Sequence, residues 1–319
     1  MDFRLTDEQQ VLRKSVREFA EAEIRPYVME WDEAQHFPES LVREMAALGL
    51  MAVQLPEDYE GAAMSAVDYC ICIEELARVD PAVALSVAAH NGLCSAHIFM
   101  FGTEAQRKKY LPPLARGEML GAWGLTEPTS GSDAAGMRTT AVKQGECWCI
   151  NGAKTFITHG STGGVMVVMA VTDRALGNRG ISAFIVERGT TGMRPGKKEN
   201  KLGMRASDTS EVVFTDCRVP AQQLLGELGQ GFVNTMQVLD AGRIGIAALS
   251  VGLAQGAYEA ALAYARERKA FGKTISSFQA IQFKLADAAT RIEAARLMTY
   301  RAAYMKEQGQ RTTLESSMA

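Results

Sequence analysis

This chain of 319 residues lacks glycine-rich nucleotide-binding motifs, cysteines at metal-binding spacing and a large excess of either charge. The six cysteines give two C-x-C pairs but no C-x-x-C, and no histidine lies at metal-ligand spacing from them. We therefore expect buried, reduced thiols and no metal site. No G-x-G-x-x-G occurs, and Glu267 stands where a P-loop ending in Gly272-Lys273-Thr274 would need glycine. Rossmann and P-loop nucleotide binding are therefore not predicted.

The charge balance argues against other classes of partner. With 34 basic and 37 acidic residues the net charge is −3, so there is no bulk attraction to nucleic acid or to anionic lipid. The most apolar run, residues 82–101, is interrupted by His90, Asn91 and His97, and we predict a buried helix there rather than a membrane span. The N-terminal segment has neither signal-peptide nor transit-peptide character. We expect a cytoplasmic protein of bacterial type with small partners.

The spacing of apolar residues changes twice along the chain. Up to about Gly117 they recur every three or four residues, as at Leu12 and Val16, which predicts helices. Short apolar runs between glycine, asparagine and aspartate then predict antiparallel strands up to about Val219. Helical spacing returns in a stripe formed by Ile281, Leu285, Ala288, Ile292 and Ala295.

This pattern predicts an α+β fold in three parts. They are an N-terminal α-helical domain (1–119), a middle antiparallel β domain (120–228) and a C-terminal helical domain (229–319). Residues 312–319 contain no proline or glycine stop and are typical of the start of another helix. We therefore expect the C-terminal helical domain to be incomplete.

Two polar segments punctuated by glycine flank a short strand pattern and predict a binding edge. They are GLTEPTSGSDAAG at 124–136 and INGAKTFITHG at 150–160. The first segment matches a signature of the acyl-CoA dehydrogenase family residue for residue, and the chain resembles that family from MDFRLTDEQQ through GTEAQRKKYLPPLARGE to RKAFGKTISSFQAIQFKLAD. The segment LDAGRIGIAALSVG at 239–252 looks most like the short-chain, butyryl-CoA branch.

The resemblance implies a cofactor, a reaction and partners. Members of the family are FAD flavoproteins of fatty acid β-oxidation. They dehydrogenate an acyl-CoA thioester between its α and β carbons to the trans-2-enoyl-CoA and pass the electrons to an electron-transfer flavoprotein. A homotetramer arranged as a dimer of dimers is the family expectation.

The resemblance also assigns flavin-binding residues. Trp123, Leu125 and Thr126 would hold the pyrimidine side of the flavin. Phe156 with Ile157 would cover a flavin face, and the hydroxyl of Thr158 would lie beside the ring nitrogen that receives hydride. From the residues alone, all of these could equally be turn, cap or strand residues.

Four further residues of the two segments carry weaker expectations. Ser132 would belong to the cofactor site and turn toward the pantetheine of the substrate. Glu127 and Asp133 form a tempting carboxylate pair, but we expect one to fix the loop and the other to cap a turn. His159 stands at a position where many relatives carry an asparagine, and we interpret it as a turn residue.

The resemblance assigns five more residues, two to coenzyme A and three to the FAD of a neighbouring subunit. Asp240 and Arg243 lie three residues apart on one helical turn and would bind coenzyme A, although a surface ion pair would have the same spacing. Arg268 and Gln279 would hold the FAD pyrophosphate of a neighbouring subunit, with Phe271 near its adenine.

The catalytic base is not identified. One branch of the family carries its glutamate at the position of Gly242, so the base is expected beyond Ala319, and this chain is predicted to have little or no turnover. Two alternatives stay open. One is a dehydrogenase for branched-chain, glutaryl or aryl acyl-CoA, or a flavin oxidase, on the same fold. The other is a non-enzymatic, base-less binding module.

Overall fold

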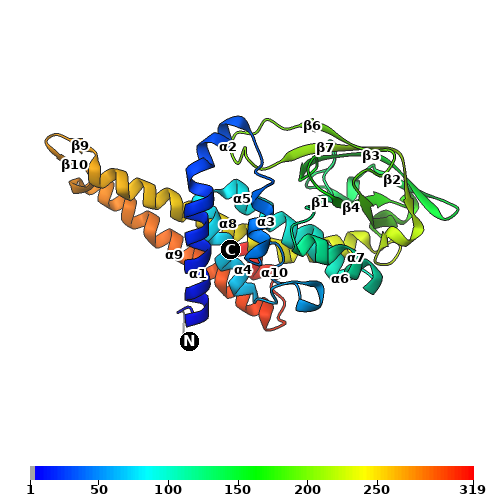
Figure 1. The fold of residues 1–319 in the computed structure, drawn as a ribbon, viewed down its shortest axis with the longest axis horizontal. Coiled ribbons are helices and arrows are strands. Elements are labelled where there is room, and N and C mark those ends of the chain that lie inside the picture. Colours follow the sequence, from blue (N-terminus) through cyan, green and yellow to red (C-terminus); the bar gives the residue numbers. More distant parts are fainter. Residues whose placement is uncertain (1–3) are drawn as a thin grey trace. The chain divides into compact units, whose positions relative to one another are not determined.

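A computed structural model describes residues 4–319, which form two compact units (Figure 1). Unit 1 comprises Met1–Met29, described from residue 4, together with Ser65–Leu85 and Arg243–Ala319. Unit 2 comprises Glu30–Met64 and Ser86–Gly242. Each unit is thus assembled from segments that are far apart in the sequence, and the three-domain boundaries drawn from the sequence stay a prediction.

Unit 1 is built from helices whose starts are marked by capping residues. Thr6 precedes α1 and Ser65 precedes α4, and each forms a reciprocal capping box with the residue three positions later. The helices of this unit are α1 (Asp7–Phe19), η1 (Ala20–Ile24), η2 (Arg25–Tyr27), α4 (Ala66–Val79), α9 (Gln279–Glu307), α10 (Thr313–Met318) and the part of α8 (Gly231–Glu267) that follows Gly242. The helix start predicted at 312–319 is confirmed by α10.

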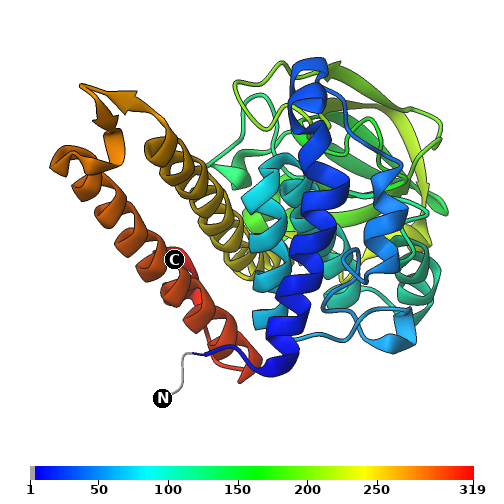
Figure 2. The same cartoon turned by 60° about the vertical axis from the view of Figure 1, so that its left-hand side comes forward.

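A short hairpin joins α8 to α9 (Figure 2). Its strands, β9 (Lys269–Ala270) and β10 (Lys273–Thr274), are antiparallel and are connected by Phe271 and Gly272, which have φ angles of 51° and 77°. Two consecutive positive φ angles give the tight turn that matches the twist of a hairpin. The predicted apolar stripe on α9 is confirmed, because its five residues are all buried or half-buried.

Two glycines let α8 approach α4 closely within unit 1. A Cβ atom added at Gly252 would lie 2.2 Å from the carbonyl oxygen of Glu74, and one at Gly256 would lie 2.1 Å from that of Arg78. The obstructing atoms belong to a helix backbone, so they cannot rotate aside as a side chain would. Because the glycines are four residues apart, they lie on one face of α8.

Replacing Gly256 by alanine is expected to destabilise unit 1 by about 1–3 kcal/mol through overpacking, although alanine alone favours a helix over glycine by about 1 kcal/mol. Thermal unfolding followed by far-ultraviolet circular dichroism measures the change. Gly242→Ala on the same helix is the matched control, since a Cβ there would lie 3.5 Å from the Leu93 side chain, an ordinary contact. Equal effects of the two substitutions would contradict the close-approach argument.

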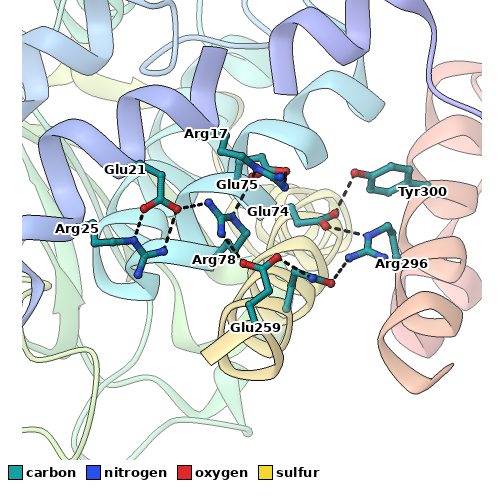
Figure 3. A network of polar contacts seen from close by, with 10 residues as sticks. Arg17, Glu21, Arg25, Glu74, Glu75, Arg78, Glu259, Arg296 and Tyr300 are labelled. Atoms are coloured by element: carbon teal, nitrogen blue, oxygen red, sulfur yellow. Dashed lines mark hydrogen bonds and ion pairs between the residues drawn. The ribbon is translucent and has the colours of Figure 1, made fainter. Parts of the chain in front are cut away.

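Arg78 is the centre of a polar network in unit 1 (Figure 3). Its side chain is 7 % exposed and donates hydrogen bonds to Glu21, Glu75 and Glu259, which come from three different helices. Arg17 on α1 binds Glu75 with two hydrogen bonds of 2.8 Å. The guanidinium of Arg78 therefore connects η1, α4 and α8, and Arg17 joins α1 to the same network through Glu75.

The network continues from α8 to α9. Gln255 donates to Glu259 at 2.8 Å and accepts from Arg296 at 2.9 Å. Arg296 and Tyr300, both on α9, donate to opposite oxygens of Glu74 at 2.8 and 2.9 Å. Arg296 also pairs with Glu293, so carboxylates and guanidinium groups alternate through this partly buried network (Figure 3).

Unit 2 combines short helices with one sheet. The helix α7 begins at a capping box formed by Thr103 and Gln106, and the Gln106 amide also donates to the carbonyl oxygens of Gln222 and Leu224. The helices that lie in this unit, or begin just before it, are α2 (Val28–Ala34), α3 (Leu41–Ala47), η3 (Glu57–Tyr59), α5 (Pro81–Ala89), η4 (His90–Ser95), α6 (Ala96–Phe101) and α7 (Glu104–Ala115).

The sheet of unit 2 has eight strands in the order β6-β7-β3-β2-β4-β5-β8, with β1 paired to β4. It is mainly antiparallel, as predicted, but β1 runs parallel to β4 and β2 meets β4 in parallel at one pair. The strands are β1 (Gly121–Gly124), β2 (Thr140–Gln144), β3 (Cys147–Thr158), β4 (Val165–Val171), β5 (Ile181–Glu187), β6 (Met193–Lys198), β7 (Thr209–Pro220) and β8 (Leu224–Leu225). The parallel strand β1 was missed because GAWG has two glycines and little strand propensity.

The strand β4 separates two hydrophobic cores of unit 2. Val165, Val167 and Met169 belong to a core with α6, α7 and part of the sheet, whereas Met166 and Val168 belong to a core with Trp148 and Phe184. Successive side chains of a strand point to opposite faces, so one strand can serve both cores. This explains why VMVVMAV is apolar at every position.

The predicted buried helix at 82–101 is confirmed with one refinement. The segment Pro81–Phe101 is helical throughout, but its middle, at His90–Ser95, is a π-helical turn. Pro81–Phe101 and Gly231–Glu267 have the length and composition of a membrane span, yet the apolar window of the first is 61 % buried within the protein, as in a core helix. The six cysteines are unpaired. Five of them are buried, as expected, whereas Cys147 is half-buried.

Candidate functional site

The two glycine-punctuated segments meet at a pocket in unit 2. Its volume is about 190 Å³. It lies where β1 continues into the first segment and where β3 ends in the second. The residues that line it are Ala89, Leu93, Gly121, Trp123, Leu125, Thr126, Phe156, Ile157 and Thr158.

An irregularity in β3 shapes one wall of this pocket. The register of β3 against β7 shifts between Lys154 and Ile157, which leaves Phe156 outside the regular ladder with a φ angle of 58°. Positive φ is rare for an aromatic residue and marks a backbone held by its surroundings. The side chain of Phe156 is 65 % exposed at the pocket.

Glu127 fixes the first segment, as one of the two loop acids was expected to do. It is buried, and its carboxylate accepts from the backbone N–H groups of Arg138 and Thr139 at 2.6 and 3.0 Å and from the Lys154 ammonium at 2.7 Å. Burial opposes ionisation, but Lys154 and these hydrogen bonds outweigh it and lower the pKa of Glu127. Glu127 is therefore an ionised structural acid.

Asp133 does not cap the turn with its carboxylate, contrary to expectation. The 3-10 turn η5 (Ala134–Gly136) has no side-chain cap; instead the carbonyl oxygen of Asp133 accepts from Ser130 and from the Gly136 N–H. Ser132 and Asp133 are both exposed, and Ser132 does not line the pocket. The polar tip of the segment thus has no side-chain cap, and hydrogen bonds from the Gly136 N–H and the Ser130 hydroxyl close the turn.

Three buried histidines hold the strand that enters the pocket. His90 Nδ1 accepts from the Gly121 N–H at 3.1 Å, and His159 Nδ1 lies 3.0 Å from the Gly121 carbonyl oxygen. His97 Nδ1 accepts from the Trp123 indole at 3.1 Å. His159 does lie in a turn, as interpreted, but it is fully buried rather than a surface turn residue.

Burial keeps these histidines neutral. It lowers the pKa of His90 to about 3, assisted by the nearby His159, and the pKa of His97 to about 4. It also lowers the pKa of His159, against the opposing effects of the Gly121 carbonyl and of Asp208. Since Nδ1 accepts in His90 and His97, the proton of each neutral ring lies on Nε2.

The residues assigned to coenzyme A lie on α8, outside the pocket lining. Asp240 is half-buried in unit 2, and Arg243 is exposed in unit 1, where it donates to the Ser317 hydroxyl at 3.0 Å. Arg268, Phe271 and Gln279 are all exposed in and beside the β9–β10 hairpin. The exposed fraction of Phe271 is 95 %, so its ring is available to another molecule.

Sequence reasoning missed three residues of the pocket. Ala89 and Leu93 enter it from α5 and η4, and Gly121 from the start of β1. The polar interruptions His90 and Asn91 were a signal that this helix does more than fill a core. A Cβ at Gly242 would lie 3.5 Å from the Leu93 side chain, so this glycine on α8 adjoins a pocket residue.

Comparison with known sequences identifies the family. Residues 6–118 match the family model described as "Acyl-CoA dehydrogenase, N-terminal domain", residues 122–217 that of the "middle domain", and residues 229–319 that of the "C-terminal domain". The chain belongs to the acyl-CoA dehydrogenase family. The predicted fold, with helical, β and helical parts in that order, is confirmed.

Individual acyl-CoA dehydrogenases are similar over nearly the whole chain. The short-chain-specific acyl-CoA dehydrogenase of Clostridium acetobutylicum is 46 % identical over all of this chain and 84 % of its own length. The solved structure of butyryl-CoA dehydrogenase from Megasphaera elsdenii is 44 % identical, with a TM-score of 0.97, covering all of this chain and 84 % of that chain. Subunit CarC of the caffeyl-CoA reductase–Etf complex of Acetobacterium woodii is 42 % identical over 98 % of this chain and 83 % of its own length.

The pocket of this acyl-CoA dehydrogenase offers hydroxyls and peptide groups rather than acids. None of its lining residues within 4–319 carries a carboxylate, and these described residues contain no cluster of potential metal ligands. The matches to all three domain models give no support to the prediction of little turnover.

Proposed function

We propose that this protein is an FAD-dependent dehydrogenase that converts a short-chain acyl-CoA thioester to the trans-2-enoyl-CoA and passes electrons to an electron-transfer flavoprotein. The observation that carries the proposal is the pocket of unit 2, because six of the residues that the family resemblance assigns to the flavin line it together. The names of the Clostridium and Megasphaera relatives support the substrate class, and that of CarC supports the acceptor.

The residues of the pocket fit a flavin ring. Within residues 4–319, the hydroxyls of Thr126 and Thr158 have no hydrogen-bond partner, and both residues line the pocket. A free hydroxyl can donate or accept, which suits the alternating edge of a flavin. Phe156 and Ile157 add apolar surface for a ring face. Bound there, FAD would supply the acceptor for the hydride that leaves the substrate β carbon.

We assign separate tasks to the surrounding residues. Trp123, Leu125 and Thr126 hold the pyrimidine side, Phe156 and Ile157 cover the ring, and Thr158 lies at the nitrogen edge. Ser132, exposed on the first segment, contacts the pantetheine as well as the cofactor region. Asp240 and Arg243 bind coenzyme A; the exposed guanidinium of Arg243 suits a phosphate or an adenine ring.

The proposed assembly brings a second subunit to each cofactor. We propose a homotetramer, a dimer of dimers, in which Arg268 and Gln279 of one subunit hold the FAD pyrophosphate of its neighbour while Phe271 packs near the adenine. The exposure of all three residues supports this role, because a group that serves another subunit must be accessible in its own. We further propose a cytoplasmic location.

The proton acceptor for the α carbon is proposed to be a carboxylate outside residues 1–319. The lack of a carboxylate among the described lining residues supports this assignment, as does glycine at position 242. A missing general base typically slows proton transfer by about 10²–10⁴-fold.

Anaerobic titration with acyl-CoA substrates tests the proposal. Protein that is reconstituted with FAD is expected to turn yellow and to be bleached by butyryl-CoA in preference to isovaleryl-CoA or glutaryl-CoA. If the base lies outside this chain, bleaching will be slow by the factor given above; rapid bleaching would overturn that assignment alone.

Other results would select the alternatives. Preferential bleaching by a branched, glutaryl or aryl thioester would change the substrate class, and oxygen consumption by the reduced protein would indicate an oxidase. A protein that takes up no FAD at any concentration tested would overturn the proposed function altogether.

A further inference from the structure

Lys154 is a lysine on β3 whose side chain is fully buried, an unusual place for a charged group. Its ammonium donates to the Leu125 carbonyl oxygen at 3.1 Å and to the Glu127 carboxylate at 2.7 Å. Both acceptors belong to the first glycine-punctuated segment, while Lys154 itself belongs to the second. One side chain therefore connects the two segments that form the pocket.

The residues around Lys154 leave room for its long side chain. A Cβ at Gly124 would lie 3.2 Å from Cγ of Lys154, so glycine at the end of β1 leaves room for the aliphatic stem. A backbone hydrogen bond of 2.9 Å from the Thr155 N–H to the Thr126 carbonyl oxygen joins the same two segments. Leu125 and Thr126, which are joined in this way, line the pocket, and Thr155 directly precedes Phe156 of the lining.

We propose that Lys154 is a positioning residue for the cofactor, because its ammonium sets the spacing between residues 125–127 and the pocket wall at 156–158. The inference rests on the proposed FAD function of that pocket. Lys154 does not line the pocket and has no direct role in catalysis. It acts through Leu125 and Glu127, which hold the backbone on which Thr126 lies.

Removal of the ammonium would take away the contacts that fix the distance between residues 125–127 and the pocket wall at 156–158. Lys154→Met keeps most of the buried volume, but it leaves the Leu125 carbonyl without this donor and the Glu127 carboxylate without its counter-ion. Removal of a hydrogen-bonding group that orients metal ligands typically costs about 10–100-fold in metal affinity or activity, and we take the same order for a group that orients flavin-binding residues. We expect Lys154→Met to weaken FAD binding by at least roughly tenfold on this basis.

The test is an FAD titration of apoprotein, followed by visible circular dichroism of the bound flavin at saturation. Two controls separate position from stability. Lys143→Met makes the same change at an exposed lysine of β2, and Val219→Ala removes volume from the buried core of the same unit. Both controls are expected to keep wild-type FAD affinity and dichroism below their unfolding temperatures, whereas Lys154→Met changes both.

A double variant guards against misfolding. Glu127→Gln with Lys154→Met removes the buried charge pair and is expected to regain stability without regaining FAD affinity or the wild-type flavin dichroism. The inference would be overturned by wild-type FAD affinity in the single or the double Lys154→Met variant, or by a loss of FAD affinity in Val219→Ala equal to that in Lys154→Met. Either result would leave the proposed function intact. Wild-type protein that binds no FAD would overturn both.

Discussion

Lowering the pH from about 7.5 to about 5 is expected to decrease the free energy of unfolding of unit 2 by about 4 kcal/mol. Two buried histidines, His90 and His97, account for this figure, since each is fully buried and accepts a hydrogen bond at Nδ1. A proton on Nδ1 would break that hydrogen bond and place a charge among apolar side chains. The folded protein therefore resists protonation of both rings. His159, whose pKa burial also lowers, acts in the same direction.

The sign of the effect follows from the pKa values. Burial lowers the pKa of His90 to about 3 and that of His97 to about 4, below the ordinary value of 6.5. The stabilisation is complete above pH 6.5 and is lost as the pH falls toward the folded values, because the unfolded chain then binds more protons. At about pH 5 each histidine accounts for about 2 kcal/mol.

Tryptophan fluorescence measures this loss selectively. The three tryptophans, Trp31, Trp123 and Trp148, all lie in unit 2, so urea unfolding followed by their emission reports on that unit. The variant His90→Gln with His97→Gln should show a flatter dependence of stability on pH between about 5 and 6.5. His36, which is exposed, supplies the matched control His36→Gln. Parallel pH profiles for wild type and the double variant would refute this account.

Replacing Arg78 by methionine is expected to destabilise unit 1 by about 3–5 kcal/mol. The guanidinium is almost fully buried and binds Glu21, Glu75 and Glu259, and the exposed fraction of the Glu75 side chain is only 3 %. Methionine fills much of the volume but removes one positive charge from among three carboxylates: Glu75 keeps Arg17 and Glu21 keeps Arg25, whereas Glu259 keeps only the Gln255 amide. Breaking a buried pair on one side costs more than the pair contributes, because the partner charge stays buried.

The helical signal in circular dichroism measures the effect, since unit 1 is almost entirely helical and contains no tryptophan. Arg25→Met is the matched control: Arg25 is half-exposed and pairs with Glu21 one turn away, an arrangement worth about 0.3–0.5 kcal/mol. Adding Glu259→Gln to Arg78→Met should recover part of the loss. A loss no larger than that of Arg25→Met would show that Arg78 is not the centre of the network.

Much of the fold could be predicted from the sequence because it depends on local patterns. The spacing of Leu12 and Val16 and the stripe on α9 follow directly from helical periodicity, and VMVVMAV is apolar enough to be a buried strand by itself. β1 and the π-helical turn at His90–Ser95 could not be predicted in this way. Both depend on partners brought close by the fold, β4 in the first case and Gly121 in the second.

The candidate site shows the same division. Family resemblance assigned Thr126, Phe156 and Thr158, which the structure brings to one pocket. It gave no warning of Leu93, because which face of a helix reaches a pocket depends on how the helix packs. Nor did it indicate that Lys154 is buried: its position follows from the register of β3 against β7, which no local pattern fixes.

The burial of β4 on both faces has a consequence for how this chain can vary. All seven of its residues are buried, so almost any polar replacement there would place an unpaired group in one of the two cores. The edge strand β6, by contrast, pairs only with β7 among the described strands, and its residues are exposed or half-buried. Two strands of one sheet should therefore differ sharply in mutational tolerance. Polar substitutions should be accepted at many positions of β6 and at almost none of β4.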